Sequence, residues 1–303
     1  MSKLKYFLIA GLLRVAGSLS LATAQRLGRM VGWLLWKLPT QPRDVTATNL
    51  SICLPELTPT ERAELSKASL ASTGMTMFEV PLMWEWPVEK CLDLVKDTQG
   101  LELLDEAMAD GSGLILLAPH LGNWELTGLF FSSRYKMAAL YSPPNVPELE
   151  NYMIRVRGRL GSELVRGDRR GLLRMMTILK EGGIAGILPD QSPRGKTNAF
   201  APFFGMDVKT MTLVAKLMQK TGANALVTYA ERLPDGQGFR IVVEKPVSGL
   251  ADEDPVIAAA ALNQSVENVV RQVPAQYQWE YKRMRHRPAG EPNPYKPDRT
   301  CLE

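Results

Sequence analysis

The residues with the clearest capacity for chemistry are His120 and Glu125. The chain has only two histidines, and an imidazole is the side chain best suited to take and return a proton near neutral pH. His120 follows the apolar run 114–118 and precedes Leu121-Gly122-Asn123, where a helix is expected to begin. The histidine is therefore expected at the carboxyl end of a strand, and ligands of open α/β sheets bind beyond such ends.

Glu125 is expected to orient this imidazole. Asn123 is a favourable N-cap and places Glu125 in the first helical turn, where the helix dipole keeps a carboxylate ionised. With the chain turning at Gly122, Glu125 can accept a hydrogen bond from one ring nitrogen and leave the other as a general base. The plainer alternative is a structural histidine that is only hydrogen-bonded at a strand end.

A nucleophilic side chain does not accompany His120. The Gly-x-Ser-x-Gly pattern of a nucleophile elbow is absent from the sequence, so direct attack by an acceptor hydroxyl is expected. The other histidine, His286, lies in the run 282–287, Lys-Arg-Met-Arg-His-Arg. That run is interpreted as a solvated basic tail, which leaves His120 as the candidate base.

Two further loops carry cations at expected strand ends. The first holds Asp190, Arg194 and Lys196, where Arg194 offers a planar fork for phosphate and Asp190 could orient it. The apolar run 199–204 is expected to form a wall beside it. The alternative is an Asp190–Arg194 pair that only stabilises the loop.

The second loop begins with Arg166 and Asp168 and leads into another helix. A single basic loop is usually solvated surface. The strand ends that carry His120, Arg166 and Asp190 are expected at one edge of the sheet. Three polar strand ends at one edge favour an anion site instead.

The elements that must position these loops alternate along the chain. Short apolar runs and helical patterns follow one another from residue 113 onward, which is typical of strands connected by crossover helices. Expected strands are 113–118, 137–141, 163–166, 184–188, 225–230 and 239–246, the last two joined by a turn at 234–238. Expected helices are 58–83, 124–131, 148–160, 171–180, 212–221 and 254–273. The sequence therefore predicts an α/β fold with a central, mostly parallel sheet flanked by helices.

Composition narrows the class of protein. With 303 residues, 45% of them hydrophobic, the chain can bury one large core. The formal charge of +4 is too small to argue for nucleic acid. The three cysteines form no Cys-x-x-Cys pattern, so neither disulfides nor a structural zinc site is indicated, and a catalytic domain facing the reducing cytosol is expected.

Residues 6–38 are predicted to attach the chain to a membrane. The segment is apolar, contains basic residues, and no acid precedes Asp44. A spanning helix needs about 20 mostly apolar residues, and 6–24 comes close although Arg14 falls within it. An interfacial amphipathic helix, a cleaved secretory signal and a buried helix of the globular core are the alternatives. Prolines at 39–42 end the segment, so the predicted division is a membrane-anchoring segment of residues 1–40 and a catalytic domain of residues 41–303.

These motifs together resemble a known family. His120-Leu-Gly-Asn-Trp-Glu125 is similar to the His-x4-Asp/Glu motif of the lysophospholipid acyltransferase superfamily. The blocks 166–168, 190–195 and 276–283, with the segment 49–56, resemble its bacterial branch, the lipid A biosynthesis (late, lauroyl or myristoyl) acyltransferases. The resemblance covers nearly the full length. Gln191-Ser192 departs from the Gly-Thr of distant relatives, so their phosphate contacts are not carried over.

The resemblance implies a glycerolphosphate acyltransferase-like fold. It implies transfer of a fatty acyl chain from acyl-acyl carrier protein to a hydroxyl of a Kdo-lipid A precursor, at the cytoplasmic face of the bacterial inner membrane. No cofactor, metal or nucleic acid is implied. The candidate catalytic residues are His120 and Glu125, and the candidate substrate-binding residues are Asn123, Arg166, Asp168, Asp190, Arg194 and Lys196.

Three other functions stay open from the sequence. The motif does not separate lipid A from another acceptor lipid, such as a glycolipid, a phosphatidylinositol mannoside or an ornithine lipid. A non-catalytic lipid-binding membrane protein would need no catalytic histidine. A hydrolase would use water in place of the acceptor alcohol.

Overall fold

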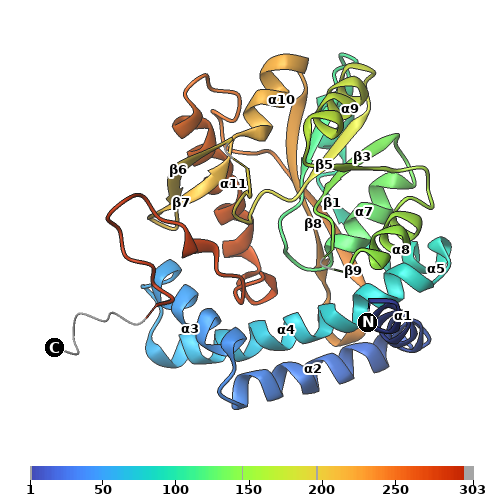
Figure 1. Cartoon of the computed structure of the whole chain (residues 1–303), viewed down its shortest axis with the longest axis vertical. Helices are drawn as coiled ribbons and strands as arrows, with labels where there is room; N and C mark the ends of the chain where they lie inside the picture. Colours follow the sequence, from blue (N-terminus) through green and yellow to red (C-terminus); the bar gives the residue numbers. More distant parts are fainter. Residues whose placement is uncertain (1, 145, 196, 297–303) are drawn as a thin grey trace.

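A seven-stranded sheet forms the centre of the computed structural model, which describes residues 2–144, 146–195 and 197–296 (Figure 1). Its strand order is β1-β9-β8-β2-β5-β3-β4. Strands β8, β2, β5, β3 and β4 run parallel, whereas β9 is antiparallel to β8. The strands are β1 Val95–Gln99, β2 Leu114–Leu117, β3 Met137–Tyr141, β4 Glu163–Arg166, β5 Ile184–Ile187, β8 Asn224–Arg232 and β9 Phe239–Glu244.

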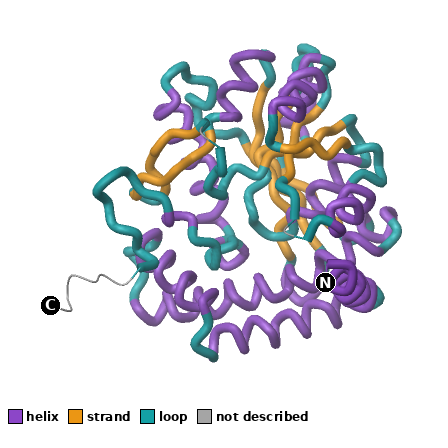
Figure 2. The backbone as a smooth tube through the Cα atoms, viewed as in Figure 1, coloured by secondary structure: helices purple, strands orange, loops and turns teal. Residues whose placement is uncertain are grey.

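Both faces of this sheet are covered, which confirms the predicted α/β class. The central strands β2 and β5 are buried along their whole length and read as continuous apolar runs. Alternate residues of β2 face opposite cores: Ile115 and Leu117 pack toward α9 Arg169–Lys180, α10 Leu213–Thr221 and α11 Pro255–Gln272. Leu114 and Leu116 pack toward α7 Trp124–Ser132 and α6 Glu102–Met108. Figure 2 shows helices on both sides of the strands.

The expected strands and helices from residue 113 onward are confirmed to within a few residues. The helix predicted from residue 58 is α4 Pro59–Glu85, and its N-terminus carries a full capping box between Thr58 and Glu61. Helix α8 is Glu148–Arg157. Not predicted were β1, the short helix α5 Val88–Leu92, and a separate hairpin of β6 Asn198–Phe203 with β7 Met206–Met211.

The first helices do not form the expected spanning helix. Helix α1 spans Ser2–Gly17 and ends there. A second helix, α2 Leu21–Lys37, begins with Ser20 as its N-cap. The prediction of one helix across residues 6–24 is therefore wrong, because a capped break divides it. In the described part of the chain, no helix is both long and apolar enough to cross a bilayer.

Helices α2 and α4 lie side by side at the bottom of Figure 1, next to α3 Gln41–Cys53. Gly28 and Gly32 of α2 meet Gly74 of α4 with their backbones in contact. A Cβ atom on Gly32 would lie 2.2 Å from the Leu70 carbonyl oxygen, and one on Gly74 would lie 2.1 Å from that of Gly28. Part of the predicted membrane segment is therefore packed against the body of the protein.

Gly32→Ala is expected to destabilise the protein by about 1–3 kcal/mol, because the added methyl group has no room between the helices. Gly11→Ala is the matched control, since a Cβ atom on Gly11 meets nothing within 4 Å and alanine is the better helix former by about 0.5–1 kcal/mol. Urea unfolding measures both variants. Equal free energies of unfolding for the two would contradict the close packing of α2 on α4.

Candidate active site

His120 follows strand β2 and is held by Asp190, which follows the neighbouring strand β5. The ring Nδ1 lies 2.9 Å from Asp190 Oδ1, and the backbone N–H of His120 donates to Asp190 Oδ2 over 3.0 Å. The Asp190 side chain is 2% exposed and that of His120 15% exposed. One buried carboxylate thus fixes both the ring and the backbone of the histidine.

The ionisation of Asp190 sets the tautomer of His120. Burial opposes its ionisation, but the positive charge of His120 when its ring is protonated, and the hydrogen bonds from that ring and its backbone, outweigh burial and hold the pKa of Asp190 below its usual value. An ionised carboxylate only accepts hydrogen bonds, so Nδ1 carries the proton. The other ring nitrogen, Nε2, is then left with a lone pair and can act as a base.

Glu125 does not make the predicted hydrogen bond to His120 in the described contacts. Arg157 of α8 donates to both of its oxygens through Nε and Nη2, and Trp84 Nε1 donates to Oε2 over 3.0 Å. The orienting role predicted for Glu125 is corrected accordingly: Asp190 orients the ring. The physical reason is strand order: β2 and β5 are neighbours, so Asp190 after β5 lies within hydrogen-bond distance of the imidazole after β2.

The Glu125–Arg157 pair is nonetheless part of the site. Both residues and Trp84 line the same cavity as His120. Burial opposes ionisation of Glu125, but the charge and hydrogen bonds of Arg157, with the hydrogen bond from Trp84, lower the pKa of Glu125. Glu125 is therefore a buried anion that is paired with Arg157.

The lowered pKa of Glu125 predicts a pH dependence of stability. A carboxylate with a lowered pKa in the folded state stabilises the fold above its unfolded pKa, about 4.3, and this contribution is lost as the pH falls through the folded value. The wild type should therefore exceed Glu125→Gln in free energy of unfolding most at pH 7, with the difference shrinking below about pH 4. Urea unfolding across this range measures it, and a difference independent of pH would contradict the assignment.

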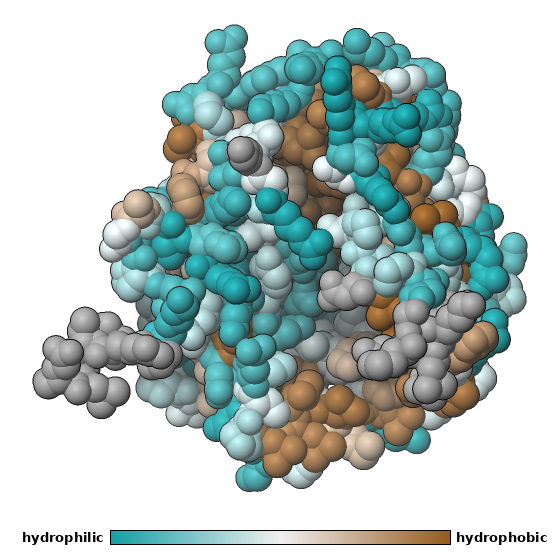
Figure 3. Space-filling view, in the orientation of Figure 1, coloured by the Kyte–Doolittle hydropathy of each residue, from teal (hydrophilic) through white to brown (hydrophobic). Residues whose placement is uncertain are grey.

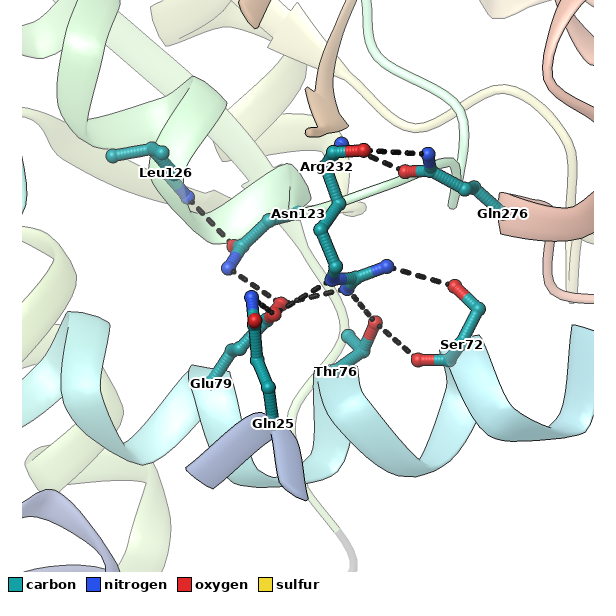
Figure 4. A network of polar contacts seen from close by, with 8 residues as sticks. All are labelled: Gln25, Ser72, Thr76, Glu79, Asn123, Leu126, Arg232 and Gln276. Carbon is teal, nitrogen blue, oxygen red and sulfur yellow. Dashed lines mark hydrogen bonds and ion pairs between the residues drawn. The ribbon is translucent and has the colours of Figure 1, made fainter. Parts of the chain in front are cut away.

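A buried polar network links α2, α4 and the end of β8 to Asn123 (Figure 4). Glu79 of α4 and Arg232 at the end of β8 form an ion pair with side chains 0% and 5% exposed. Arg232 also donates to Ser72 and Thr76, and Gln25 of α2 donates to Glu79 over 2.8 Å. Helices α2 and α4 are thereby tied to the end of β8.

Asn123 joins this network to the His120 loop. Its Oδ1 accepts from the Leu126 N–H over 3.0 Å, which confirms the predicted N-cap, and its Nδ2 donates to Glu79 over 3.2 Å. The side chain is 0% exposed. Its inclusion among substrate-binding residues is corrected, since it is enclosed by protein groups and fixes the loop.

The segment 276–283 closes over the same loop. Gly122 adopts φ 61°, a left-handed conformation that suits glycine, and its N–H donates to the Gln276 carbonyl over 3.1 Å. The Gln278 N–H donates to the His120 carbonyl over 3.1 Å. The closing motif identified in the sequence thus holds the backbone on both sides of the turn.

A cavity of about 1010 Å³ opens at the carboxyl ends of β2, β3, β4 and β5. Polar groups of its lining include His120, Glu125, Arg157 and Gln191. Most of the remaining wall is apolar, formed by Leu116, Leu129, Phe131, Met137, Leu140, Val156, Leu164, Leu172 and Met175. Such a cavity suits a molecule with a reactive polar group and a long hydrocarbon chain.

The structure brings the predicted cationic loops to this cavity. Arg166, Asp168 and Arg194 all line it. The Asp168 carboxylate accepts from the Gly171 N–H and caps α9, and Arg166 is paired with Glu150. Lys196 lies outside the described residues. The apolar run 199–204 is not among the described residues that line the cavity, because in β6 it packs largely against α11.

The sequence analysis did not identify the roles that three residues have in this site. Arg157 had a usable signal, since it lies four residues after Met153 and next to Val156 on the buried face of α8. A cation on an apolar helix face requires a partner. Gln191 and the orienting role of Asp190 had no such signal, because both depend on β5 pairing with β2.

Known proteins resemble this chain along most of its length. Residues 1–286 match the family model described as "Bacterial lipid A biosynthesis acyltransferase". The lipid A biosynthesis lauroyltransferase of Escherichia coli (strain K12) is 26% identical over 286 residues, which cover 94% of this chain and 92% of the relative. The palmitoleoyltransferase of the same organism is 28% identical over 270 residues, 89% of this chain and 87% of the relative. Its myristoyltransferase is 28% identical over 275 residues, 89% of this chain and 82% of the relative.

Proposed function

The chain belongs to the family of bacterial lipid A biosynthesis acyltransferases and is an acyltransferase, and we propose that it acylates a hydroxyl of a Kdo-lipid A precursor with His120 as general base. The observation that carries this proposal is the imidazole at the cavity wall, with Nδ1 bonded to buried Asp190. This arrangement is a base with its orienting acid.

The proposed reaction is a direct transfer. His120 Nε2 takes the proton from the acceptor hydroxyl while the hydroxyl oxygen attacks the carbonyl carbon of the donor thioester. The tetrahedral intermediate then expels the thiolate, which takes this proton from the imidazolium. Asp190 stabilises the imidazolium between these steps, and the anionic Glu125 nearby favours the same positive charge.

The proposed donor is acyl-acyl carrier protein. The apolar wall of the cavity gives the acyl chain a place beside the reactive histidine. The three similar E. coli proteins are named for lauroyl, palmitoleoyl and myristoyl transfer, and mass spectrometry of the product measures the acyl chain length that this protein transfers.

Arg166 and Arg194 are proposed to bind phosphate of the acceptor or of the donor's phosphopantetheine. Arg194→Ala should therefore raise KM more than it lowers kcat, since the contact is made in the ground state and the transition state alike. Steady-state kinetics, with each substrate varied in turn, measures the changes in KM and kcat separately. A large fall in kcat at unchanged KM would contradict a binding role.

The chain is proposed to lie on the cytoplasmic face of the inner membrane, attached through α1 and α2. Apolar side chains gather at the lower edge of the molecule (Figure 3). In α1 and α2, Leu12, Met30 and Trp33 are 70%, 53% and 48% exposed. An interfacial attachment fits this surface, because amphipathic helices bind with their apolar face in the headgroup region. Leu12→Glu with Trp33→Glu should reduce flotation with anionic vesicles, and unchanged flotation would argue against attachment here.

An assay with purified protein tests the proposed function. Acyl-acyl carrier protein and a Kdo-lipid A precursor should yield a product heavier by one acyl chain, as measured by mass spectrometry. If the acyl chain is transferred only to a different membrane lipid, such as an ornithine lipid, that lipid is the acceptor and the proposed lipid A precursor is not. Release of free fatty acid without transfer would instead indicate a hydrolase.

A further inference from the structure

Gln191 is hydrogen-bonded to Nε2 of His120, the nitrogen proposed to act as the base. The amide nitrogen of Gln191 lies 3.3 Å from His120 Nε2. Because Nδ1 donates to Asp190, Nε2 accepts, and the Gln191 amide must be the donor. A side chain with no part in the reaction described above thus points a hydrogen-bond donor at the atom that takes the proton.

Gln278 fixes the orientation of this amide. Its Oε1 accepts from the Gln191 amide nitrogen over 3.2 Å, and its own backbone N–H is anchored to the His120 carbonyl. The opposite orientation of Gln191 would place its oxygen against two acceptors, Nε2 and Gln278 Oε1. The closing segment therefore keeps the donor side of the amide at the cavity.

Five backbone N–H groups around His120 already donate to acceptors within the protein. The N–H of His120 donates to Asp190, that of Leu121 to the Pro119 carbonyl, that of Gly122 to the Gln276 carbonyl and that of Asn123 to the Ala230 carbonyl. The Ser192 N–H donates to the Tyr281 hydroxyl. These five N–H groups already have acceptors within the protein, whereas the Gln191 amide points at Nε2 itself.

We propose that the Gln191 amide is an oxyanion donor: it caps Nε2 before substrates bind and stabilises the oxyanion once they are bound. This inference rests on the proposed acyl transfer. The acceptor hydroxyl displaces the amide from Nε2 and gives its proton to that nitrogen, as its oxygen forms a bond to the thioester carbon. The carbonyl electron pair moves to oxygen, where the amide N–H donates. When the carbonyl re-forms, the C–S bond breaks and the thiolate takes the proton from the imidazolium.

The geometry suits this exchange. A donor that begins one hydrogen-bond length from the base needs only a small side-chain rotation to reach an oxygen on the carbon being attacked, while Gln278 still accepts its second N–H. One oxyanion donor typically contributes about 10²–10³ in kcat. The energy is gained only in the transition state, because the ground-state carbonyl carries less charge.

Three variants of Gln191 test the inference with the full-length protein. Gln191→Met keeps the length of the side chain without a donor and should lower kcat by about 10²–10³ with KM changed less than fivefold or so. Gln191→His restores a ring N–H and should recover part of the lost kcat. Gln191→Glu should shift the acidic limb of the kcat/KM profile to higher pH, because a carboxylate beside Nε2 favours the protonated ring. Melting temperatures check that each variant is folded.

The outcomes are distinct. A folded Gln191→Met with kcat within about threefold of the wild type, or above it, would overturn the donor role and leave the proposed function intact. A wild type that transfers no acyl group from acyl-acyl carrier protein to the lipid A precursor would overturn both.

Discussion

His120→Ala is expected to lose nearly all acyl transfer. A general base typically contributes about 10²–10⁴ in rate, and His120 is the one histidine among the described residues that line the cavity. The hydroxyl would then have to lose its proton to solvent. Initial rates with purified protein and saturating substrates measure the loss.

His286→Ala is the matched control for this variant. His286 is exposed, lies beyond the 3-10 helix Arg283–Arg285 and is absent from the described lining of the cavity. It should keep wild-type turnover. Near wild-type activity in His120→Ala, with the melting temperature unchanged, would remove the imidazole from the mechanism.

Asp190→Asn has the second large expected effect. Both carboxylate oxygens of Asp190 accept a hydrogen bond, one from Nδ1 and one from the His120 backbone. Asparagine has only one acceptor oxygen, so one of these contacts is replaced by a donor facing a donor. If the ring adapts, the proton moves to Nε2 and the base is lost. Turnover is expected to fall by about 10² or more, within the range of general-base catalysis.

The tautomer of His120 separates Asp190 from Glu125 as the orienting acid. In a His286→Ala background the chain contains one imidazole, so ¹⁵N NMR reports on His120 alone. Glu125→Gln leaves both Asp190 contacts in place and should keep the proton on Nδ1, whereas Asp190→Asn should shift it toward Nε2. A shift in the Glu125 variant alone would restore the role that the sequence first indicated.

The sequence predicted where the site residues lie in the fold better than it predicted which of them are hydrogen-bonded to each other. His120 at a strand end, the N-cap Asn123 and the strands that carry both loops follow from local patterns such as apolar runs and capping residues. Asp190 was recognised as a site residue but given a different partner. Its carboxylate reaches the imidazole only because β5 lies beside β2, and the order of strands in a sheet is a property of tertiary packing.

Long-range polar pairs were missed for the same reason. Glu79 and Arg232 are separated by 153 residues and meet only in the folded chain. Nothing in their local sequence distinguishes them from surface charges. The predicted spanning helix was wrong for a local reason: Ser20 caps a new helix and interrupts the apolar stretch, a signal present in the sequence but outweighed by the hydrophobicity around it.

Lipid mass spectrometry of a deletion strain tests the central claim most directly. Cells that lack this gene should contain lipid A lighter by one acyl chain, and complementation with the wild-type chain should restore that mass. Complementation with His120→Ala, expressed at the same level, should leave the lighter species. Restoration by the alanine variant, or lipid A of full mass in the deletion strain itself, would contradict the account.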